Sequence, residues 1–164
     1  MGLTDLFANK LDERAICLNS VIFAHQNHEM FCDRLEPTLY LLQRLALPIR
    51  YRYIIENQSL FSQEIKDAIF TLRLEQFIER VHSITGDSFR SKINLVELEH
   101  PLLSVLEKTG TEILQCAATY DILRCHYHGI GKSEKKSACF CKIKHPTSTK
   151  TAAFHLLQRL QLIS

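Results

Sequence analysis

Turn-forming residues are scarce in this sequence, whose 164 residues include five glycines and four prolines. Chains built mainly from strands and turns need many of both, whereas long helices need few. Their scarcity therefore favours a helical fold. Long apolar runs are also missing: none reaches the roughly 18–20 residues of a membrane-spanning helix, so no membrane span is expected.

Neither sign of charge is in large excess, since 20 Lys and Arg stand against 18 Asp and Glu, a formal net charge of +2. Such a balance is no evidence for nucleic acid by itself, so that evidence must come from local clustering. Hydrophobic residues make up 46% and charged residues 23%. This is ordinary globular usage and excludes wholesale disorder, and the length suits one domain over 1–164 with a real core.

A secretory signal is not evident at the start, where MGLTDLFANKLDER is acidic and its apolar run is interrupted early. This favours an intracellular protein of the cytoplasm or nucleus. A mature secreted chain that had lost its signal would begin in the same way. The distinction decides how the cysteines are interpreted, because disulfides belong to oxidising compartments and metal thiolates to reducing ones.

Apolar residues recur at three- and four-residue steps along most of the chain, which is typical of helices buried on one face. Ser62 is placed to cap one of them, and Pro37 and Pro101 suit first helical turns. We predict an all-α fold, a single-domain bundle of about five helices. Two segments are uncertain: 49–59 is a short strand or a helical turn, and 87–98 is a loop or a short strand. The predicted helices cover 11–34, 37–48, 62–82, 101–120 with Gly110 marking a break or a close approach, and 150–162 with Ala153, Leu156, Leu157 and Leu160 buried.

Soft metal ligands cluster between residues 125 and 145, a segment predicted to be a loop. Cys125 and His128 have the spacing C-x2-H, and Cys141 and His145 have C-x3-H. Two ligands three residues apart lie on one face of a helix end, and a second pair returned by a loop completes a tetrahedron. Thiolate and imidazole are ligands that Zn²⁺ accepts. The sequence therefore predicts one structural zinc ion that staples this C-terminal loop.

The ligand set has alternatives. Cys139 is placed to chelate together with Cys141, and His126 lies beside the same cluster. His25, His28 and Cys32 form a second group on the first predicted helix, where His28 and Cys32 are four residues apart and supply half a site. The spacing resembles that of two-Cys, two-His zinc fingers with the inner pair exchanged. The intervening GIGKSEKKSACF does not have the pattern of an aromatic and a leucine that forms their small core, so neither the finger fold nor its DNA docking follows. Without metal, the cysteines would be small buried hydrophobes or disulfide partners.

Lysines form a basic strip between positions 132 and 150, with Glu134 as the one acid. Such strips bind backbone phosphates, and nearby aromatic rings, here Phe140 and Tyr127, stack on bases. The strip therefore indicates a nucleic-acid-binding surface, and the alternative is a solvated loop. Its members are Lys132, Lys135, Lys136, Lys142, Lys144 and Lys150.

Catalytic motifs are missing: the sequence has no glycine-rich phosphate loop, no H-E-x-x-H and no G-x-S-x-G. A closed four-ligand zinc site has no open position for substrate. We therefore expect a non-enzymatic, zinc-stabilised interaction or regulatory protein, of the kind that viral accessory and host-interaction factors represent, with a protein partner that the sequence does not identify. The alternatives are a nucleic-acid-binding regulator and a secreted, disulfide-bonded helical cytokine.

One short segment carries a resemblance. LLQRLAL at 41–47 resembles the S-L-Q-x-L-A elongin-binding box of lentiviral infectivity factors, which also contain a His/Cys zinc site. Leu41 stands in the place of the serine, and the box precedes the metal cluster instead of following it. The resemblance implies a ubiquitin-ligase adaptor, and it covers seven residues.

Overall fold

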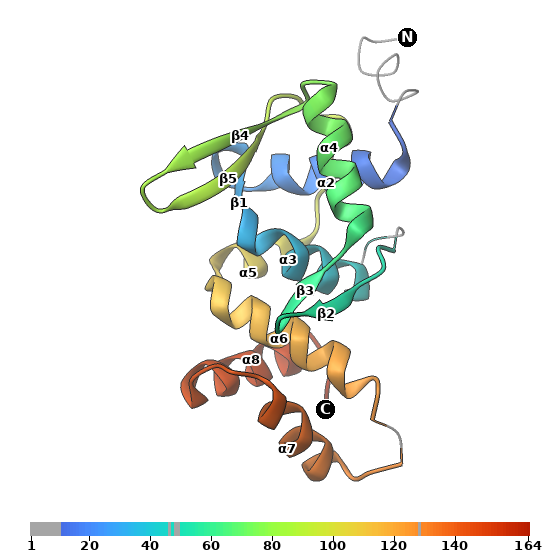
Figure 1. Cartoon of the computed structure of the whole chain (residues 1–164), viewed down its shortest axis with the longest axis vertical. Helices are drawn as coiled ribbons and strands as arrows, with labels where there is room; N and C mark the ends of the chain where they lie inside the picture. The colour runs from blue at the N-terminus through green and yellow to red at the C-terminus, as the bar shows by residue number, and fades with distance from the viewer. Residues whose placement is uncertain (1–10, 46, 48–49, 128) are drawn as a thin grey trace.

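The structure, a computed structural model, describes residues 11–45, 47, 50–127 and 129–164. Within these ranges the chain forms seven α-helices, one three-stranded antiparallel sheet and one two-stranded hairpin. The prediction of an all-α bundle is therefore wrong, and the fold is mixed α/β. Figure 1 shows an elongated molecule with the three-stranded sheet near one end and a group of helices at the other.

The helices and strands alternate irregularly along the chain. None of the helices in the described ranges is long and apolar enough to cross a membrane. The helices are α2 (Glu13–Ala24), α3 (Cys32–Leu45), α4 (Gln63–Leu74), α5 (Pro101–Lys108), α6 (Thr111–Arg124), α7 (Lys132–Lys142) and α8 (Thr147–Arg159), with a 3-10 turn at Gln26–His28. The strands are β1 (Glu29–Phe31), β2 (Ile54–Glu56), β3 (Ser59–Phe61), β4 (Ile78–Ser83) and β5 (Gly86–Ser91).

The turns that reverse the chain explain why the helical prediction failed. Most of them do not use glycine: Asn57, Gln58 and Gln76 adopt left-handed backbone conformations with φ of 48°, 66° and 62°. Asn57 and Gln58 turn β2 back onto β3, and Gln76 turns the chain from α4 into β4. Low glycine and proline content therefore did not exclude strands, because amide side chains took the turn positions.

The predicted helix over 62–82 is two elements. Its start is confirmed, since the Ser62 hydroxyl accepts a hydrogen bond from the Ile65 amide at 3.4 Å. The helix ends at Leu74, and residues 78–83 form β4, which pairs with β5 in sheet order β1-β5-β4. Ile78 and Val81, which fitted a helical stripe, instead lie in this strand.

Helix α3 begins at Cys32, five residues before Pro37. A proline has no amide hydrogen, so the carbonyl of Asp33 loses its partner within the helix. The side-chain amide of Gln115, on α6, donates to that carbonyl at 3.2 Å. Helix α6 thus satisfies a backbone group that the proline leaves open.

The contact between α3 and α6 joins the two ends of the molecule. Asp121 on α6 is fully buried and accepts hydrogen bonds from the Tyr40 hydroxyl at 2.7 Å and the Arg44 Nε at 2.9 Å. The Arg124 Nε donates to the other carboxylate oxygen at 2.7 Å. Arg124 also donates to the carbonyl of Leu162, so the same group holds the C-terminal segment. Buried carboxylates need such partners, because an unpaired buried charge is strongly destabilising.

The C-terminal region is helical throughout most of its length, including the segment predicted as a zinc-stapled loop, which contains α7. Helix α7 turns Cys139 toward the interior, and the following Ile143 is also buried. The break at Gly110 is confirmed, since α5 ends at Lys108 and α6 begins at Thr111. The last predicted helix is α8, and its four predicted core residues, Ala153, Leu156, Leu157 and Leu160, are buried.

Candidate functional site

Among the described residues, those predicted to bind zinc form no cluster of three or more ligands. Cys125 is exposed at the end of α6, Cys141 is exposed on α7, and Cys139 is buried. Cys139 and Cys141 are two residues apart on a helix, roughly 200° around its axis, so they cannot both face one ion. His145 lies half-buried beyond α7. His128 is outside the described residues.

The prediction of a zinc-binding protein is therefore corrected. No group of three or more His, Cys, Asp or Glu side chains that could hold a metal ion occurs in the described ranges. All six cysteines are free thiols. The alternative ligands have other roles: His28 stacks on Phe23 with ring centroids 3.9 Å apart, burial raises the pKa of the Cys32 thiol, and the His126 Nδ1 donates to the carbonyl of Ile122.

Several lysines of the basic strip contact the protein itself. Two lysines of α7, Lys136 and Lys142, place their ammonium groups over aromatic rings. Phe140 is not a free ring for base stacking, because its centroid lies 4.7 Å from that of Tyr120. Nucleic-acid binding stays a prediction, with Lys135 half-buried and Lys144 exposed. The internal contacts are Lys136 over Phe154 at 3.8 Å, Lys142 over Tyr127 at 5.1 Å, Lys150 to the Phe140 carbonyl at 2.8 Å, and Lys132 to the Ser164 hydroxyl.

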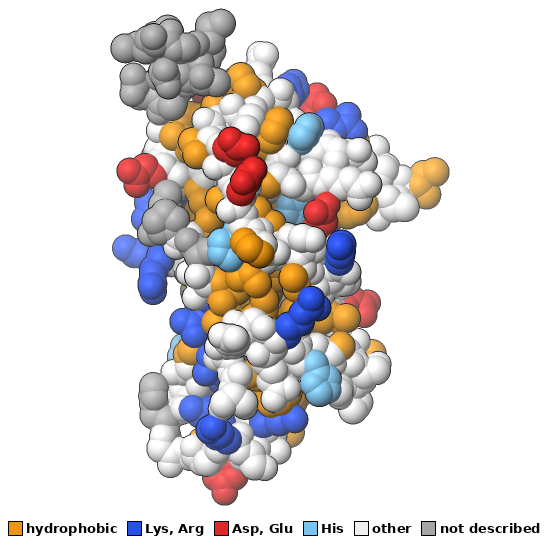
Figure 2. All heavy atoms as spheres, turned by 180° about the vertical axis from the view of Figure 1, so that it is seen from behind, with side chains coloured by type: hydrophobic (Ala, Val, Ile, Leu, Met, Phe, Trp, Pro, Cys, Tyr) orange, Lys and Arg blue, Asp and Glu red, His pale blue; other side chains and the backbone are white. Residues whose placement is uncertain are grey.

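Charge is divided unequally along the chain. Residues 108–164 contain nine Lys and Arg but three Asp and Glu, whereas residues 1–107 contain eleven and fifteen. Figure 2 shows the consequence on one face, where Lys and Arg predominate among the charged side chains of the lower part and acidic groups lie mainly above. One concavity of the upper part is lined by several acidic side chains.

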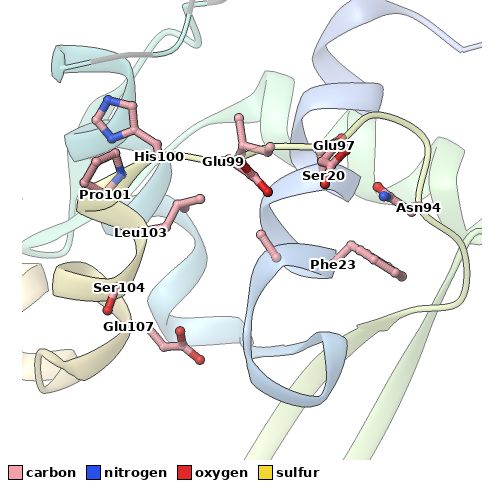
Figure 3. Close-up of a pocket in the computed structure, with 12 residues that line it drawn as sticks. Ser20, Phe23, Asn94, Glu97, Glu99, His100, Pro101, Leu103, Ser104 and Glu107 are labelled. Carbon is pink, nitrogen blue, oxygen red and sulfur yellow. The ribbon is translucent and has the colours of Figure 1, made fainter.

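This concavity, here called the acidic cleft, has a volume of about 680 Å³. Figure 3 shows it bounded by α2 on one side, α5 on the other and the 92–100 linker across one end. The linker is fixed at its start by Asn19, a buried α2 residue that donates to the Ile93 carbonyl at 2.9 Å and accepts from the Ser91 hydroxyl at 2.8 Å. At its other end, the His100 Nδ1 accepts from the Leu102 amide and caps α5. The walls of the cleft are thus held by specific hydrogen bonds.

Three carboxylates, Glu97, Glu99 and Glu107, line the acidic cleft, and its lining contains no Lys or Arg. In Figure 3 the carboxylates of Glu99 and Glu107 extend into the space between the linker, α5 and α2. None of the three has an ion-pair partner in the part of the chain that the structure describes. Glu107 accepts one hydrogen bond, from the Gln26 amide at 2.7 Å. Apolar contact surface comes from Phe23, Pro101 and Leu103.

A smaller pocket of about 350 Å³, the side pocket, shares Glu107 with the cleft and is lined by His25. His25 ends α2, and its Nδ1 lies 2.9 Å from the Val21 carbonyl. Because a carbonyl only accepts, Nδ1 carries the proton. Burial lowers the pKa of His25, so the ring is neutral at pH 7 and Nε2 is an acceptor. His25 is 7% exposed, and its Nε2 has no partner among the described residues.

The backbone beside His25 is unusual. Asn27 and His28 are consecutive residues in the left-handed region, with φ of 58° and 55°. Such conformations are unfavourable for residues with a Cβ and persist only where surrounding contacts hold them. The His28 Nδ1 donates to the Phe23 carbonyl at 2.6 Å and supplies one such contact. Arg34 closes the far side of the pocket, donating to the Leu106 carbonyl at 2.9 Å.

The carboxylates of the acidic cleft were not predicted as a site. Glu97 lies in the span 87–98, whose conformation the sequence left open, and Glu99 comes just after it. Glu107 looks like an ordinary solvated residue of a helix. No local spacing relates them to α2, so tertiary structure alone brings them together. Residues 41–45 of the segment that resembles the elongin-binding box lie in α3, where Leu41 and Leu42 are buried in the core. In comparisons of the chain with protein-family models, curated proteins and solved structures, none matched.

Proposed function

We propose that this chain is a non-enzymatic binding protein whose acidic cleft receives a positively charged segment of a partner protein. The observation that carries the proposal is the cleft lining, which holds three carboxylates, apolar side chains and no Lys or Arg. A cation entering the cleft gains unpaired carboxylates and meets no competing positive charge from the lining. The sequence predicted a protein partner without identifying it, and the cleft lining adds that the segment it binds is positively charged.

A segment fits the cleft better than a single cation does. Exposed ion pairs contribute little each, about 0–1 kcal/mol, so one Lys or Arg would be held weakly. Several cations along one segment would engage Glu97, Glu99 and Glu107 together. Apolar residues between them would cover Phe23 and Leu103 and add hydrophobic burial.

The neighbouring side pocket, which shares Glu107 with the cleft, adds a place for a hydrogen-bond donor of the same ligand. A buried acceptor without a hydrogen bond costs roughly 1–3 kcal/mol, and the His25 Nε2 is such an acceptor among the described residues. A partner group that carries an N–H or O–H and enters the side pocket would remove this cost. One extended ligand could supply both groups, with its positively charged segment in the cleft and its hydrogen-bond donor in the side pocket.

Binding of labelled peptides tests the proposal. The probe is a nine-residue peptide in which Arg and Leu alternate, and its counterpart has Glu in place of Arg. Fluorescence anisotropy at low salt should detect the basic peptide and not the acidic one, with affinity falling as salt rises. Glu97→Lys with Glu99→Lys should weaken binding about tenfold or more, since like charges then face each other.

A matched variant, Glu75→Lys with Glu112→Lys, makes the same change of net charge at exposed positions that do not line the cleft. It should bind the basic peptide within about threefold of wild type. Equal loss in both variants, or no binding of the basic peptide, would overturn the proposal. A labelled single-stranded oligonucleotide is the third probe: binding that Lys135→Glu with Lys136→Glu abolishes would support the nucleic-acid alternative instead.

A further inference from the structure

A second surface, unrelated to the acidic cleft, lies along β2. In the hairpin of β2 and β3, Glu56 pairs with Ser59 and Ile55 with Leu60 around the two-residue turn at Asn57 and Gln58. Residues that flank such a turn form the hydrogen-bonded pair, and the next pair is not hydrogen-bonded across the strands. The N–H and C=O of Ile55 therefore point away from β3, toward the outer edge of the hairpin.

This outer edge is unprotected. The described residues contribute two strands to the sheet, so no third strand covers β2. Edge strands of soluble proteins are usually blunted by lysine, proline or a bulge. Strand β2 has none of these, although it is three residues long and ends in the exposed Glu56, and its apolar side chains Ile54 and Ile55 are 58% and 37% exposed. Backbone groups and apolar side chains are thus both free to contact another chain.

A groove of about 520 Å³ runs beside this edge. One wall is β2 and the other is the end of α6 with the residues that follow it. The groove is mainly apolar, and the hydroxyl of Tyr53 is buried without a partner among the described residues. Its lining is Tyr53, Ile54, Ile55, Ile122, Leu123, His126, Tyr127 and Lys142.

The charge of the groove is opposite to that of the acidic cleft. Lys142 and His126 line it, and no Asp or Glu does. Arg52 lies just before β2 with a side chain that is 92% exposed, and its Nε lies 3.8 Å from the carboxylate of Glu64. The ring of Tyr127 under the Lys142 ammonium is neutral and does not cancel its charge. A ligand with carboxylates therefore meets positive charge here, whereas a basic ligand is repelled.

We propose that β2 and this groove bind an extended segment of a partner protein in which apolar residues alternate with acidic ones. The segment adds to the hairpin as a third strand through the N–H and C=O of Ile55. Its alternate side chains point to opposite faces, so apolar residues enter the groove, and the positive charges of Lys142 and Arg52 attract the carboxylates that lie on the other face. A helical ligand would leave the Ile55 backbone groups unused.

Three peptides test the proposal. The probe is a labelled seven-residue peptide in which Val and Glu alternate, the second peptide has Lys in place of Glu, and the third is the probe with alternate backbone amides N-methylated. Only the probe should bind, because N-methylation removes the donors that a third strand needs and lysine meets Lys142. Anisotropy should detect it with a dissociation constant below about 1 mM.

Variants separate strand addition from other modes. Lys142→Glu should weaken binding about threefold to tenfold, and Lys144→Glu, an exposed lysine outside the groove lining, should change it less. Ile55→Pro removes the outward N–H and leaves the pairing of Glu56 with Ser59 in place, so it should abolish binding in a protein that still unfolds cooperatively. The Glu97→Lys, Glu99→Lys variant should bind the probe as wild type does, which keeps this test independent of the cleft.

Several outcomes would overturn the proposal. Equal affinity for the N-methylated peptide would mean that the groove binds without strand addition. Equal affinity for the lysine peptide would remove the acidic specificity, and undetectable binding of the probe would remove the site. Sedimentation supplies one more outcome: a wild-type dimer that Ile55→Pro dissociates would make a second copy of this chain the occupant in place of a different partner.

Discussion

The acidic cleft and the basic strip are both clusters of like charge, yet they differ in how available their charges are. The lysines of the strip lie close together in the sequence, between positions 132 and 150. Four of them contact rings, a carbonyl or a hydroxyl of the same chain. The carboxylates of the cleft come from the linker and α5 and have no ion-pair partner among the described residues. A run of charge in a sequence therefore does not measure free charge on a surface.

The same contrast holds for packing. Around the cleft, α2 packs on α4 and β5, so helices cover a sheet. At the other end, α6 packs on α7 and α8, and Cys139 is the one buried residue of α7. Regions with few buried apolar contacts open at lower free energy. We expect α7 to open before the sheet does.

Paired truncations in the two regions should have the largest effects. Leu72 on α4 and Leu157 on α8 are both fully buried, so each Leu→Ala change should lower the free energy of unfolding by about 2–5 kcal/mol. Leu157→Ala should speed hydrogen exchange mainly in α7 and α8, and Leu72→Ala mainly in α4 and β4. Denaturant unfolding and exchange mass spectrometry measure both. If hydrogen exchange became faster at every amide to the same extent in both variants, the two regions would unfold as one cooperative unit, and the proposed difference between them would be wrong.

Asp121→Asn weakens the contact between α3 and α6 and should lower the free energy of unfolding by less than the leucine truncations do. Removing one partner of a buried ion pair typically costs 3–5 kcal/mol, and here about 2–3 kcal/mol is expected because Arg44 and Arg124 keep partial access to water. Glu134→Gln, an exposed change on α7, is the control and should alter stability by less than about 0.5 kcal/mol. Denaturant titrations of both variants test this. Equal stability of Asp121→Asn and wild type would show that the α3–α6 contact does not depend on this charge.

A pH dependence should be the smallest effect, and it belongs to the region of the cleft. Burial lowers the pKa of His25 in the folded protein, so the unfolded chain binds this proton more readily. Stability is therefore full above the unfolded pKa of about 6.5 and falls as pH drops below it. His25→Gln should flatten the stability profile between about pH 7.5 and 5.5. A profile as steep in His25→Gln as in wild type would assign the effect to other groups.

Two carboxyl groups should affect stability only at lower pH, so they should not contribute between about pH 7.5 and 5.5, where the His25 effect is measured. Hydrogen bonds from Ser88 and Arg90 lower the pKa of Glu29, and those from His82 and Arg80 lower the pKa of Asp87. Their contributions are present above the ordinary carboxyl range of about 4 and are lost only as pH falls below it. The decline assigned to His25 should therefore precede theirs on acidification.

The sequence was sufficient where a structural signal is local. Ser62 followed by an apolar stripe located the start of α4, Gly110 separated α5 from α6, and the spacing of Ala153, Leu156 and Leu157 located the buried face of α8. Strands β1 to β3 are three residues each, too short for alternation to be distinguished from helical spacing. Lysine is a good helix former, and its propensity accounts for α7 in a segment that was predicted as a loop.

The candidate site could not be predicted in the same way. His25 was noted as a member of a ligand group, but its neutral state and the missing partner of Nε2 depend on burial by other elements. Glu107 meets Gln26 across 81 residues of sequence. Such a contact has no signature in either segment alone, because neither the side chains nor their spacing specify the partner.

The contacts between α3 and α6 have a consequence for biosynthesis. Asp33 meets Gln115 across 82 residues, and Tyr40 meets Asp121 across 81. A nascent chain therefore presents α3 long before its partner helix has been translated, with Tyr40 lacking its carboxylate and the Asp33 carbonyl lacking its donor. Contacts of such high sequence separation slow folding, because a long loop must close before they form. The part of the molecule that is synthesised first is thus completed only after most of the chain has left the ribosome.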